Sequence, residues 1–119
     1  MIKKVNLYIN IPFYDVDKMN LVWFGNYFKY FDCARTLLFK KYKISILNKK
    51  SSIKKFIWPI VETNCIYRSA ISYGDKVKVT AEMLNNKHFI KINYIIKNKN
   101  KIVAQAYTMQ AKSLRLNLK

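Results

Sequence analysis

Two aspartates, Asp15 and Asp17, stand in a short loop that leads directly into a stretch rich in aromatic residues. The segment from Phe13 to Arg35 reads FYDVDKMNLVWFGNYFKYFDCAR. The start of a helix offers unpaired N–H groups and a partial positive charge, and both of these polarise a carbonyl oxygen. A carboxylate beside such a helix start can serve as a base or as a nucleophile. These residue types therefore predict chemistry on a carbonyl group, and they place it at this loop.

The elements on either side of the loop follow from the spacing of apolar residues. Residues 2–13 alternate apolar and polar side chains, which predicts a half-buried strand that ends near Pro12. From Leu21 the spacing changes to three and four, which predicts an amphipathic helix with Asn20 as its N-cap. The apolar face of this helix is expected to consist of Phe24, Tyr27, Phe28, Phe31, Ala34 and Leu38.

Four further strands are predicted after the helix. Residues 45–55 are polar and basic, which is typical of a connecting loop, and strands are expected at 56–71, 76–83, 89–96 and 102–114. Because the turns between them are short, neighbouring strands are expected to be antiparallel. The chain is therefore interpreted as one α+β domain, residues 1–119, with a five-stranded antiparallel sheet wrapped around one long central helix. Pairing of the exposed sheet edges between two copies predicts a symmetric dimer.

The composition narrows the class of protein. No apolar run approaches the length of a membrane span, and residues 1–10 alternate rather than form the apolar core of a signal peptide, so a soluble cytoplasmic protein is expected. Cys33 and Cys65 are expected to be reduced thiols, and with His88 as the only histidine no metal site is expected.

The net charge of +17 would suit a nucleic-acid binder, but two features of the basic residues argue against one. Lysine outnumbers arginine twenty to three, whereas proteins that read base edges rely on arginine. The lysines are also scattered along the chain, and their abundance alongside asparagine and isoleucine indicates a general compositional bias. The functional alternative is attraction to an anionic ligand or to an acidic partner protein.

The motifs of this chain resemble those of the hotdog-fold acyl-CoA thioesterases, specifically the 4-hydroxybenzoyl-CoA thioesterase-like group. The resemblance rests on Asp15-Val-Asp17, Val22-Trp23-Phe24, Tyr27 and Asp32-Cys-Ala34-Arg35, and further along on Trp58-Pro59-Ile60-Val61, Tyr67 and Tyr73-Gly-Asp75. It covers nearly the whole chain. It implies hydrolysis of an acyl-CoA thioester, with no cofactor other than the coenzyme A of the substrate, and assembly as a homodimer or a homotetramer.

The resemblance also implies roles for individual residues. Asp17 would attack the thioester directly or activate water, and the backbone N–H groups at Phe24 and Gly25 would polarise the carbonyl oxygen. Many relatives carry histidine at the position of Phe24, so a mechanism that needs a side-chain acid or base there cannot operate. The family usually has glycine at the position of Asn20, and asparagine tolerates the positive φ of such a turn better than most residues do.

Other residues near the motifs have expected supporting roles. Asp15 is expected to hold the loop by accepting backbone N–H bonds, and Asp32 and Arg35 are expected to pair with each other or across the dimer. Lys87 lies in the turn where some relatives bind the phosphates of coenzyme A. The candidates for contact with the substrate are Asn20, Val22, Trp23, Tyr27, Asn64, Lys87 and His88.

Some interpretations stay open at the level of sequence. The substrate can be an acyl group on coenzyme A or on acyl carrier protein, an acidic partner that a basic surface would suit. A binding module that holds acyl chains without hydrolysing them is a further alternative, motivated by the missing histidine. For Trp23 and Tyr27 the alternative is a place in the core, and for His88 it is an exposed turn residue without a role in the site.

Overall fold

One antiparallel sheet curves around one helix in the computed structural model, which describes residues 2–44 and 56–114. The main elements are β1 (Lys3–Asn10), α1 (Asn26–Lys41), β3 (Ile60–Tyr67), β4 (Lys76–Asn85), β5 (Phe89–Asn98) and β6 (Lys101–Ala111). Shorter elements are the 3-10 helix η1 (Phe13–Asp15) and the paired strands β2 (Phe56–Ile57) and β7 (Ser113–Leu114). This architecture confirms the predicted hotdog fold.

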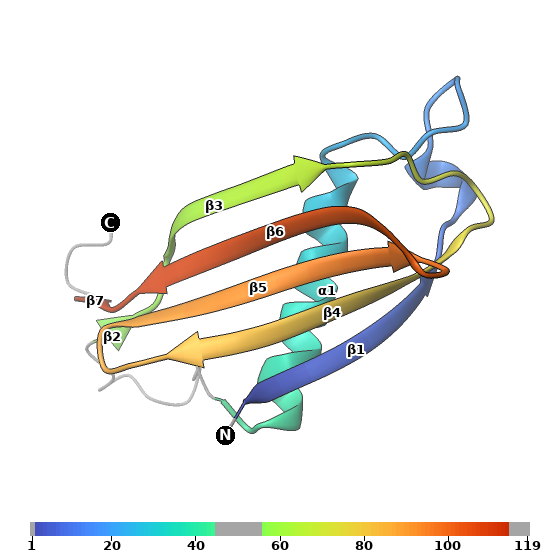
Figure 1. Ribbon diagram of the computed structural model, residues 1–119. Coiled ribbons are helices and arrows are strands. Elements are labelled where there is room, and N and C mark those ends of the chain that lie inside the picture. The colour runs from blue at the N-terminus through green and yellow to red at the C-terminus, as the bar shows by residue number, and fades with distance from the viewer. Residues whose placement is uncertain (1, 45–55, 115–119) are drawn as a thin grey trace.

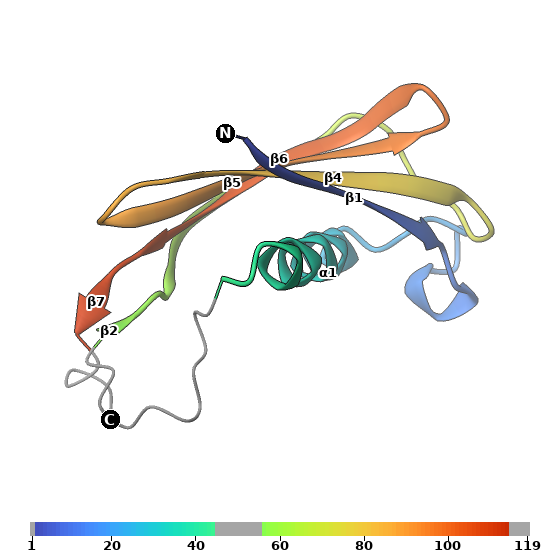
Figure 2. The ribbon, with the colours of Figure 1, turned by 90° about the horizontal axis from the view of Figure 1, so that it is seen from below.

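The five strands of the main sheet are ordered β1-β4-β5-β6-β3, and every neighbouring pair is antiparallel. The helix α1 lies against the concave face of this sheet (Figure 2). The end of β1 and the start of β4 are at the same end of the sheet, because Asn10 pairs with Lys76. The loop after β1, the loop between β3 and β4 and the β5–β6 turn all gather at that end, whereas the β4–β5 turn lies at the other (Figure 1).

Period-two alternation in the strands explains how the sheet covers the helix. In β4 the side chains at Val77, Val79, Ala81 and Met83 are buried, and the residues between them are more exposed. β5 alternates in the same way. Four of the helix residues expected on the apolar face are buried in the core, namely Tyr27, Phe31, Ala34 and Leu38.

Two predicted boundaries near the Asp17 loop were wrong. The first strand ends at Asn10, and after Pro12 the chain turns into η1, which leaves Phe13 73% exposed instead of on the inner face. The helix begins at Asn26 with Gly25 as its N-cap, so Asn20 does not cap it. The reason is that Leu21 forms an isolated β-bridge with Ser72, which requires extended backbone where helical spacing predicted a helix.

The two longest predicted strands are each divided. The segment expected as one strand over 56–71 breaks at Trp58–Pro59 into β2 and β3, because proline cannot donate to a strand ladder. The last strand is likewise divided into β6 and β7. The expected loop at 45–55 lies outside the described residues. Within the described ranges, no helix is both long and apolar enough to cross a membrane.

Candidate active site

Two loops at the same end of the sheet hold each other in place. Val16 forms an isolated bridge with Val22, so residues 16–22 make a narrow excursion, and Asp17 is the first residue after the bridge. The Val22 N–H donates to the Ile71 carbonyl over 2.8 Å, which fixes this excursion to the loop before β4. The excursion projects beyond the sheet and the helix (Figure 1). Asp17 is therefore presented on a short, hydrogen-bonded support rather than on a free loop.

The Asp17 carboxylate is held by one of its two oxygens. Its Oδ1 accepts the Met19 N–H at 2.8 Å and the Leu21 N–H at 3.2 Å. Asn20, the residue between them, has φ 63°, which bears out the expectation that the turn at this position needs positive φ. Across the described ranges, Oδ2 of Asp17 has no hydrogen-bond partner, and the residue is exposed. One carboxylate oxygen is therefore fixed while the other is free to meet a substrate.

The chain just before α1 supplies unpaired N–H groups. The Asn26 N–H donates to the Trp23 carbonyl at 2.9 Å and the Trp23 N–H donates to the Asp15 carbonyl at 3.2 Å. Neither the Phe24 nor the Gly25 N–H has an acceptor within residues 2–44 and 56–114. Both groups lie at the positive end of the helix dipole. These are the two N–H groups that the sequence predicted as donors to a carbonyl oxygen.

Gly25 lies directly under the side chain of Trp23. A Cβ at position 25 would lie 2.1 Å from Cζ3 of the Trp23 indole, so the ring rests directly over the glycine. The backbone there is ordinary right-handed helix, with φ −65° and ψ −25°, so conformation alone does not call for glycine. The absence of a side chain lets the indole cover the start of the helix. Trp23 remains 55% exposed, so the ring also offers a face to a ligand.

Asp15 anchors the loop to the helix from inside the protein. Its carboxylate is buried, and it accepts the Tyr30 hydroxyl at 2.6 Å and the Lys29 ammonium at 2.5 Å. The Asn26 side-chain amide donates to the Asp15 carbonyl at 2.9 Å. The expected structural role is confirmed, but the donors to the carboxylate are side chains of α1 rather than the backbone N–H groups that were predicted. Burial and the nearby Asp15 carboxylate raise the pKa of Tyr30, which keeps its hydroxyl a donor at neutral pH.

An aromatic wall connects the helix start to the edge strand β3. The Tyr67 hydroxyl donates to the Phe24 carbonyl at 3.0 Å, and the Tyr67 ring meets the rings of Phe24 and Tyr27 edge to face. Burial, together with the nearby Cys65, raises the pKa of Tyr67 to about 12, so the hydroxyl stays protonated and remains a donor. Burial also raises the pKa of the Cys65 thiol, which argues against Cys65 as a nucleophile near neutral pH.

Of the remaining predicted residues, some lie in the core or beside Asp17, and others lie away from it. Val22 and Tyr27 are buried in the core, with the Tyr27 hydroxyl 3.5 Å from the Ser69 carbonyl oxygen. Asn20 is close to Asp17, and its side-chain oxygen accepts the Tyr73 N–H at 3.3 Å. Asn64 is on β3, but strand alternation puts it on the face away from the helix, since its neighbour Cys65 packs against the core. Asn64 is thus not brought to Asp17 within one chain.

Lys87 and His88 lie at the opposite end of the sheet from Asp17. They occupy the exposed β4–β5 turn, where the Asn86 side-chain oxygen accepts the His88 N–H at 2.7 Å. The length of β4, at about 3.3 Å per residue, separates this turn from the Asp17 end by roughly 30 Å. Within one chain, neither residue can contact the same thioester as Asp17.

The remaining predictions concern the Asp32–Arg35 pair and metal ligands, and one residue of the site, Tyr67, was not predicted. Arg35 pairs with Asp32 at 2.8 Å, as expected. No group of three or more potential metal ligands occurs in the part of the chain that the structure describes. Tyr67 was not recognised as a site residue, because its contact with Phe24 joins positions 43 residues apart. The sequence signals for it were its place on an apolar strand expected beside the helix and its match to the family pattern, and neither indicated a contact with Phe24.

One protein-family model matches most of the chain. Residues 19–104 match the family model described as "Thioesterase superfamily", a range that includes Phe24 and Gly25 and begins just after Asp17. No curated protein sequence matches the chain significantly.

Similar solved structures share the fold over nearly the whole chain. A 1,4-dihydroxy-2-naphthoyl-CoA thioesterase from Synechocystis has 17% identity and a TM-score of 0.85, covering 94% of this chain and 83% of its own. A DHNA-CoA thioesterase from Staphylococcus aureus has 24% identity and a TM-score of 0.82, covering 98% and 78%. A 12:0-ACP thioesterase from Umbellularia californica has 13% identity and a TM-score of 0.79, covering 92% and 42%.

Proposed function

Because the chain belongs to the thioesterase superfamily, a family of thioester hydrolases, we propose that it hydrolyses an acyl-CoA thioester to the free acid and coenzyme A. One observation carries the proposal. Asp17 has one carboxylate oxygen fixed by two N–H groups and the other unpartnered among the described residues, in a loop that leads to two unpaired N–H groups at a helix start. This combination supplies a base or nucleophile together with an oxyanion site.

The proposed reaction begins with the thioester carbonyl oxygen accepting the N–H groups of Phe24 and Gly25. These donors stabilise the negative charge that develops on this oxygen in the transition state. Asp17 Oδ2 then either attacks the carbonyl carbon, so that the coenzyme A thiolate leaves and water hydrolyses the resulting anhydride, or removes a proton from an attacking water. A thioester is a reactive acyl donor, so one carboxylate and one oxyanion site suffice without a serine triad.

We further propose that the site is completed by a second copy of the chain. β3 forms an edge of the sheet, and all of its residues except Cys65 are exposed. The exposed side chains include the apolar Ile60, Val61 and Ile66. An unpaired, apolar edge strand is a template for pairing with another strand. Pairing along β3 would also cover the aromatic wall at Tyr67.

The oligomeric state can be tested on this edge. Replacing Val61 and Ile66 by lysine is expected to convert a dimer into a monomer, because lysine on an edge strand opposes pairing. Sedimentation velocity would measure the change, and thioester hydrolysis should be lost with the dimer. A double variant that remains dimeric and active would show that copies do not pair along β3.

A carrier-protein thioester is the second candidate substrate. The net charge of +17 favours an acidic partner, and one of the similar structures is a 12:0-ACP thioesterase. Hydrolysis of the same acyl group on coenzyme A and on acyl carrier protein, compared by kcat/KM, separates the two possibilities. We expect the coenzyme A thioester to be the better substrate.

The proposed function is tested by following thiol release from a panel of aromatic, short-chain and polyene acyl-CoAs. Wild type, Asp17→Asn and a control, Glu82→Gln, should be compared. Glu82 is also a carboxylate, but it lies on β4 between the buried Ala81 and Met83 and so faces away from the helix. We expect hydrolysis by wild type and Glu82→Gln only. If wild type releases thiol from no substrate, the chain is not a hydrolase of these thioesters, and a non-catalytic acyl-binding module becomes the better interpretation. Equal release by Asp17→Asn would show that another group is the base or nucleophile.

A further inference from the structure

An exposed apolar surface occupies the end of the sheet that carries the Asp17 loop. Phe13 and Tyr14 in η1 are 73% and 83% exposed, and Met19 in the excursion is 77% exposed. Tyr73, in the loop before β4, is 55% exposed. We call these four side chains the apolar tip. Large apolar side chains that gather on one exposed surface mark a site of contact with another protein or with a membrane.

Direct contacts hold the apolar tip together. The rings of Phe13 and Tyr73 meet edge to face, with their centroids 5.6 Å apart. The Asn20 side-chain oxygen accepts the Tyr73 N–H at 3.3 Å, which joins the loop before β4 to the excursion. The Lys29 ammonium lies 5.4 Å from the centroid of the Tyr14 ring. The apolar tip is therefore one supported surface rather than a set of independent loop ends.

The apolar tip projects from the body of the protein. η1 and the excursion extend beyond the sheet and the helix, with the loop before β4 beside them (Figure 1, Figure 2). A protein partner would need a concave face of matching shape to cover such a projection, whereas lipid headgroups rearrange around it. Tyrosine also favours the membrane–water interface, because its ring is apolar and its hydroxyl is polar. The shape and the residue types of the tip therefore suit the interface of a bilayer.

The charge of the chain favours a negatively charged partner. It has 23 lysine and arginine residues against six aspartate and glutamate residues. Near the apolar tip, the carboxylate of Asp15 is paired with Lys29, and that of Asp75 accepts the Asn98 side-chain amide at 3.0 Å. Lys18 is exposed in the excursion, and it forms no ion pair with any residue that the structure describes. Uncompensated positive charge therefore lies directly beside the tip.

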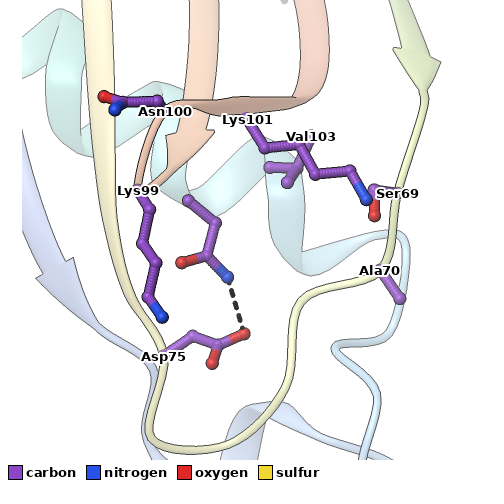
Figure 3. A pocket seen from close by; sticks show the side chains of 8 residues that line it. Ser69, Ala70, Asp75, Lys99, Asn100, Lys101 and Val103 are labelled. Carbon is purple, nitrogen blue, oxygen red and sulfur yellow. Dashed lines mark hydrogen bonds between the residues drawn. The ribbon is translucent and has the colours of Figure 1, made fainter.

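The β5–β6 turn brings two more lysines to this end of the sheet. A hollow of about 630 Å³ separates the turn from the loop before β4. Figure 3 shows Lys99 directed from the turn toward Asp75, and Lys101 extending toward Ser69. Neither lysine has an ion-pair partner within residues 2–44 and 56–114. Both lysines are therefore available to an anionic surface that approaches this end of the sheet.

A bilayer with anionic lipids fits both the apolar tip and the charge beside it. A nucleic acid would match the positive charge but leave the apolar side chains without a partner. A second copy of the chain would cover the tip, but pairing two tips would bring Lys18, Lys99 and Lys101 of both copies together, and like charges repel. Anionic headgroups match the lysines, and the boundary beneath the headgroups accepts the apolar side chains.

We propose that the apolar tip docks on the surface of a lipid bilayer that contains anionic lipids. The lysines attract the chain to this surface, at about fivefold in binding for each basic residue close to it. The rings of Phe13 and Tyr14 enter the boundary below the headgroups. The inference goes beyond the proposed function and does not depend on it. Since Asp17 lies in the same excursion as Met19, docking would place the candidate active site next to the bilayer surface.

The first test is sedimentation with lipid vesicles, made either of phosphatidylcholine alone or of phosphatidylcholine with phosphatidylserine. Wild type should bind the vesicles that contain phosphatidylserine, and raised salt should weaken this binding. Phe13→Ser/Tyr14→Ser should lower the partition coefficient at least about tenfold, because two rings that leave water on docking are removed. Wild type that binds neither vesicle or both equally, or binding that is unchanged in the double variant, would overturn the proposal.

A matched control removes exposed apolar side chains from the opposite end of the sheet. Ile2 is 61% exposed and Leu84 is 49% exposed, and the pairing of Lys3 with Met83 places both at the end away from Asp17. Ile2→Ser/Leu84→Ser should bind the vesicles as wild type does, because these side chains stay in water when the tip is docked. An equal loss of binding in the two double variants would show that the tip has no special role, which overturns the proposal.

The second test reports the orientation of the bound chain. Tryptophan fluorescence shifts to the blue when the indole leaves water. Tyr14→Trp should therefore show a blue shift with the phosphatidylserine vesicles, after the signal of Trp23 and Trp58 in wild type is subtracted. Leu84→Trp should show none. A blue shift in Leu84→Trp, or none in Tyr14→Trp, would refute docking through the apolar tip.

Measurements without lipid separate the other partners from a bilayer. Sedimentation velocity should give the same oligomeric state for wild type and Phe13→Ser/Tyr14→Ser. A smaller species in the variant would assign the tip to an interface between copies and overturn the proposal. Binding of acyl carrier protein should also be the same in both, and weaker binding in the variant would assign the tip to an acidic protein instead. If wild type docks on vesicles but hydrolyses no thioester, the proposed function fails while this inference stands.

Discussion

Tyr67→Phe removes a single hydroxyl group that supports the proposed oxyanion site. This hydroxyl donates to the Phe24 carbonyl at 3.0 Å, and the same peptide unit contributes the unpaired Gly25 N–H. A hydrogen bond to the carbonyl polarises the peptide and strengthens its N–H as a donor. The Phe24 carbonyl also accepts the Tyr27 N–H at 3.3 Å, so it keeps one donor after the substitution. The expected loss is therefore that of one ordinary hydrogen bond, about 1 kcal/mol, which corresponds to about fivefold in kcat.

The assay is steady-state hydrolysis of the best acyl-CoA, with kcat and KM determined separately. The expected result is a lower kcat with KM unchanged, because the N–H groups act mainly on the charge formed in the transition state. Tyr107→Phe is a matched control, since it removes a hydroxyl that joins β6 to β3 by donating to Glu62 and that has no hydrogen bond to the helix start within the described residues. The reasoning is refuted if Tyr67→Phe keeps wild-type kcat, or if Tyr107→Phe lowers kcat equally.

Three further predictions concern residues around the site and in the core. Gly25→Ala should push the Trp23 ring off the helix start, which should shift the tryptophan fluorescence to the red. The unfolding free energy should change by no more than about 1 kcal/mol. An unshifted spectrum would contradict the position of the ring over Gly25. Asp15→Asn should destabilise the protein by about 2–3 kcal/mol in urea, because the buried Tyr30 hydroxyl and the half-exposed Lys29 ammonium lose their charged acceptor. A loss below about 1 kcal/mol would contradict the anchoring role. Burial raises the pKa of Tyr94 from 10.0 to about 12, so its neutral form stabilises the fold fully below pH 10, and about 3 kcal/mol is lost as the pH rises from 10 through 12. Tyr94→Phe should show a correspondingly smaller loss over that range, and identical losses would refute this.

The architecture could be predicted from the sequence because each strand carries its own alternation and the turns are short. Predictions failed where pairing with a distant segment overrode the local pattern. Leu21 has helical spacing, but its bridge to Ser72 requires extended backbone, so the helix begins at Asn26. The strand expected over 56–71 was divided by Pro59, although its missing N–H was visible in the sequence.

The candidate site shows the same division between local and long-range information. Asp17, Phe24 and Gly25 were selected from one continuous motif, and the structure places the expected unpaired groups there. The contact between Tyr67 and Phe24 depends on how β3 packs beside the helix, which periodicity does not specify. Successive turns of an antiparallel sheet lie at alternate ends, so topology alone could have placed the Lys87 turn at the end of the sheet opposite Asp17.

Single-turnover hydrolysis by Asp17→Asn tests the central claim most directly. With enzyme in excess over acyl-CoA, thiol release reports the chemical step, and binding of the acyl-CoA is measured separately on the same variant. The variant should bind acyl-CoA as the wild type does and release thiol about 10³-fold more slowly, the usual contribution of a catalytic base. A variant that binds normally and releases thiol within tenfold of the wild-type rate would show that Asp17 is not the catalytic carboxylate.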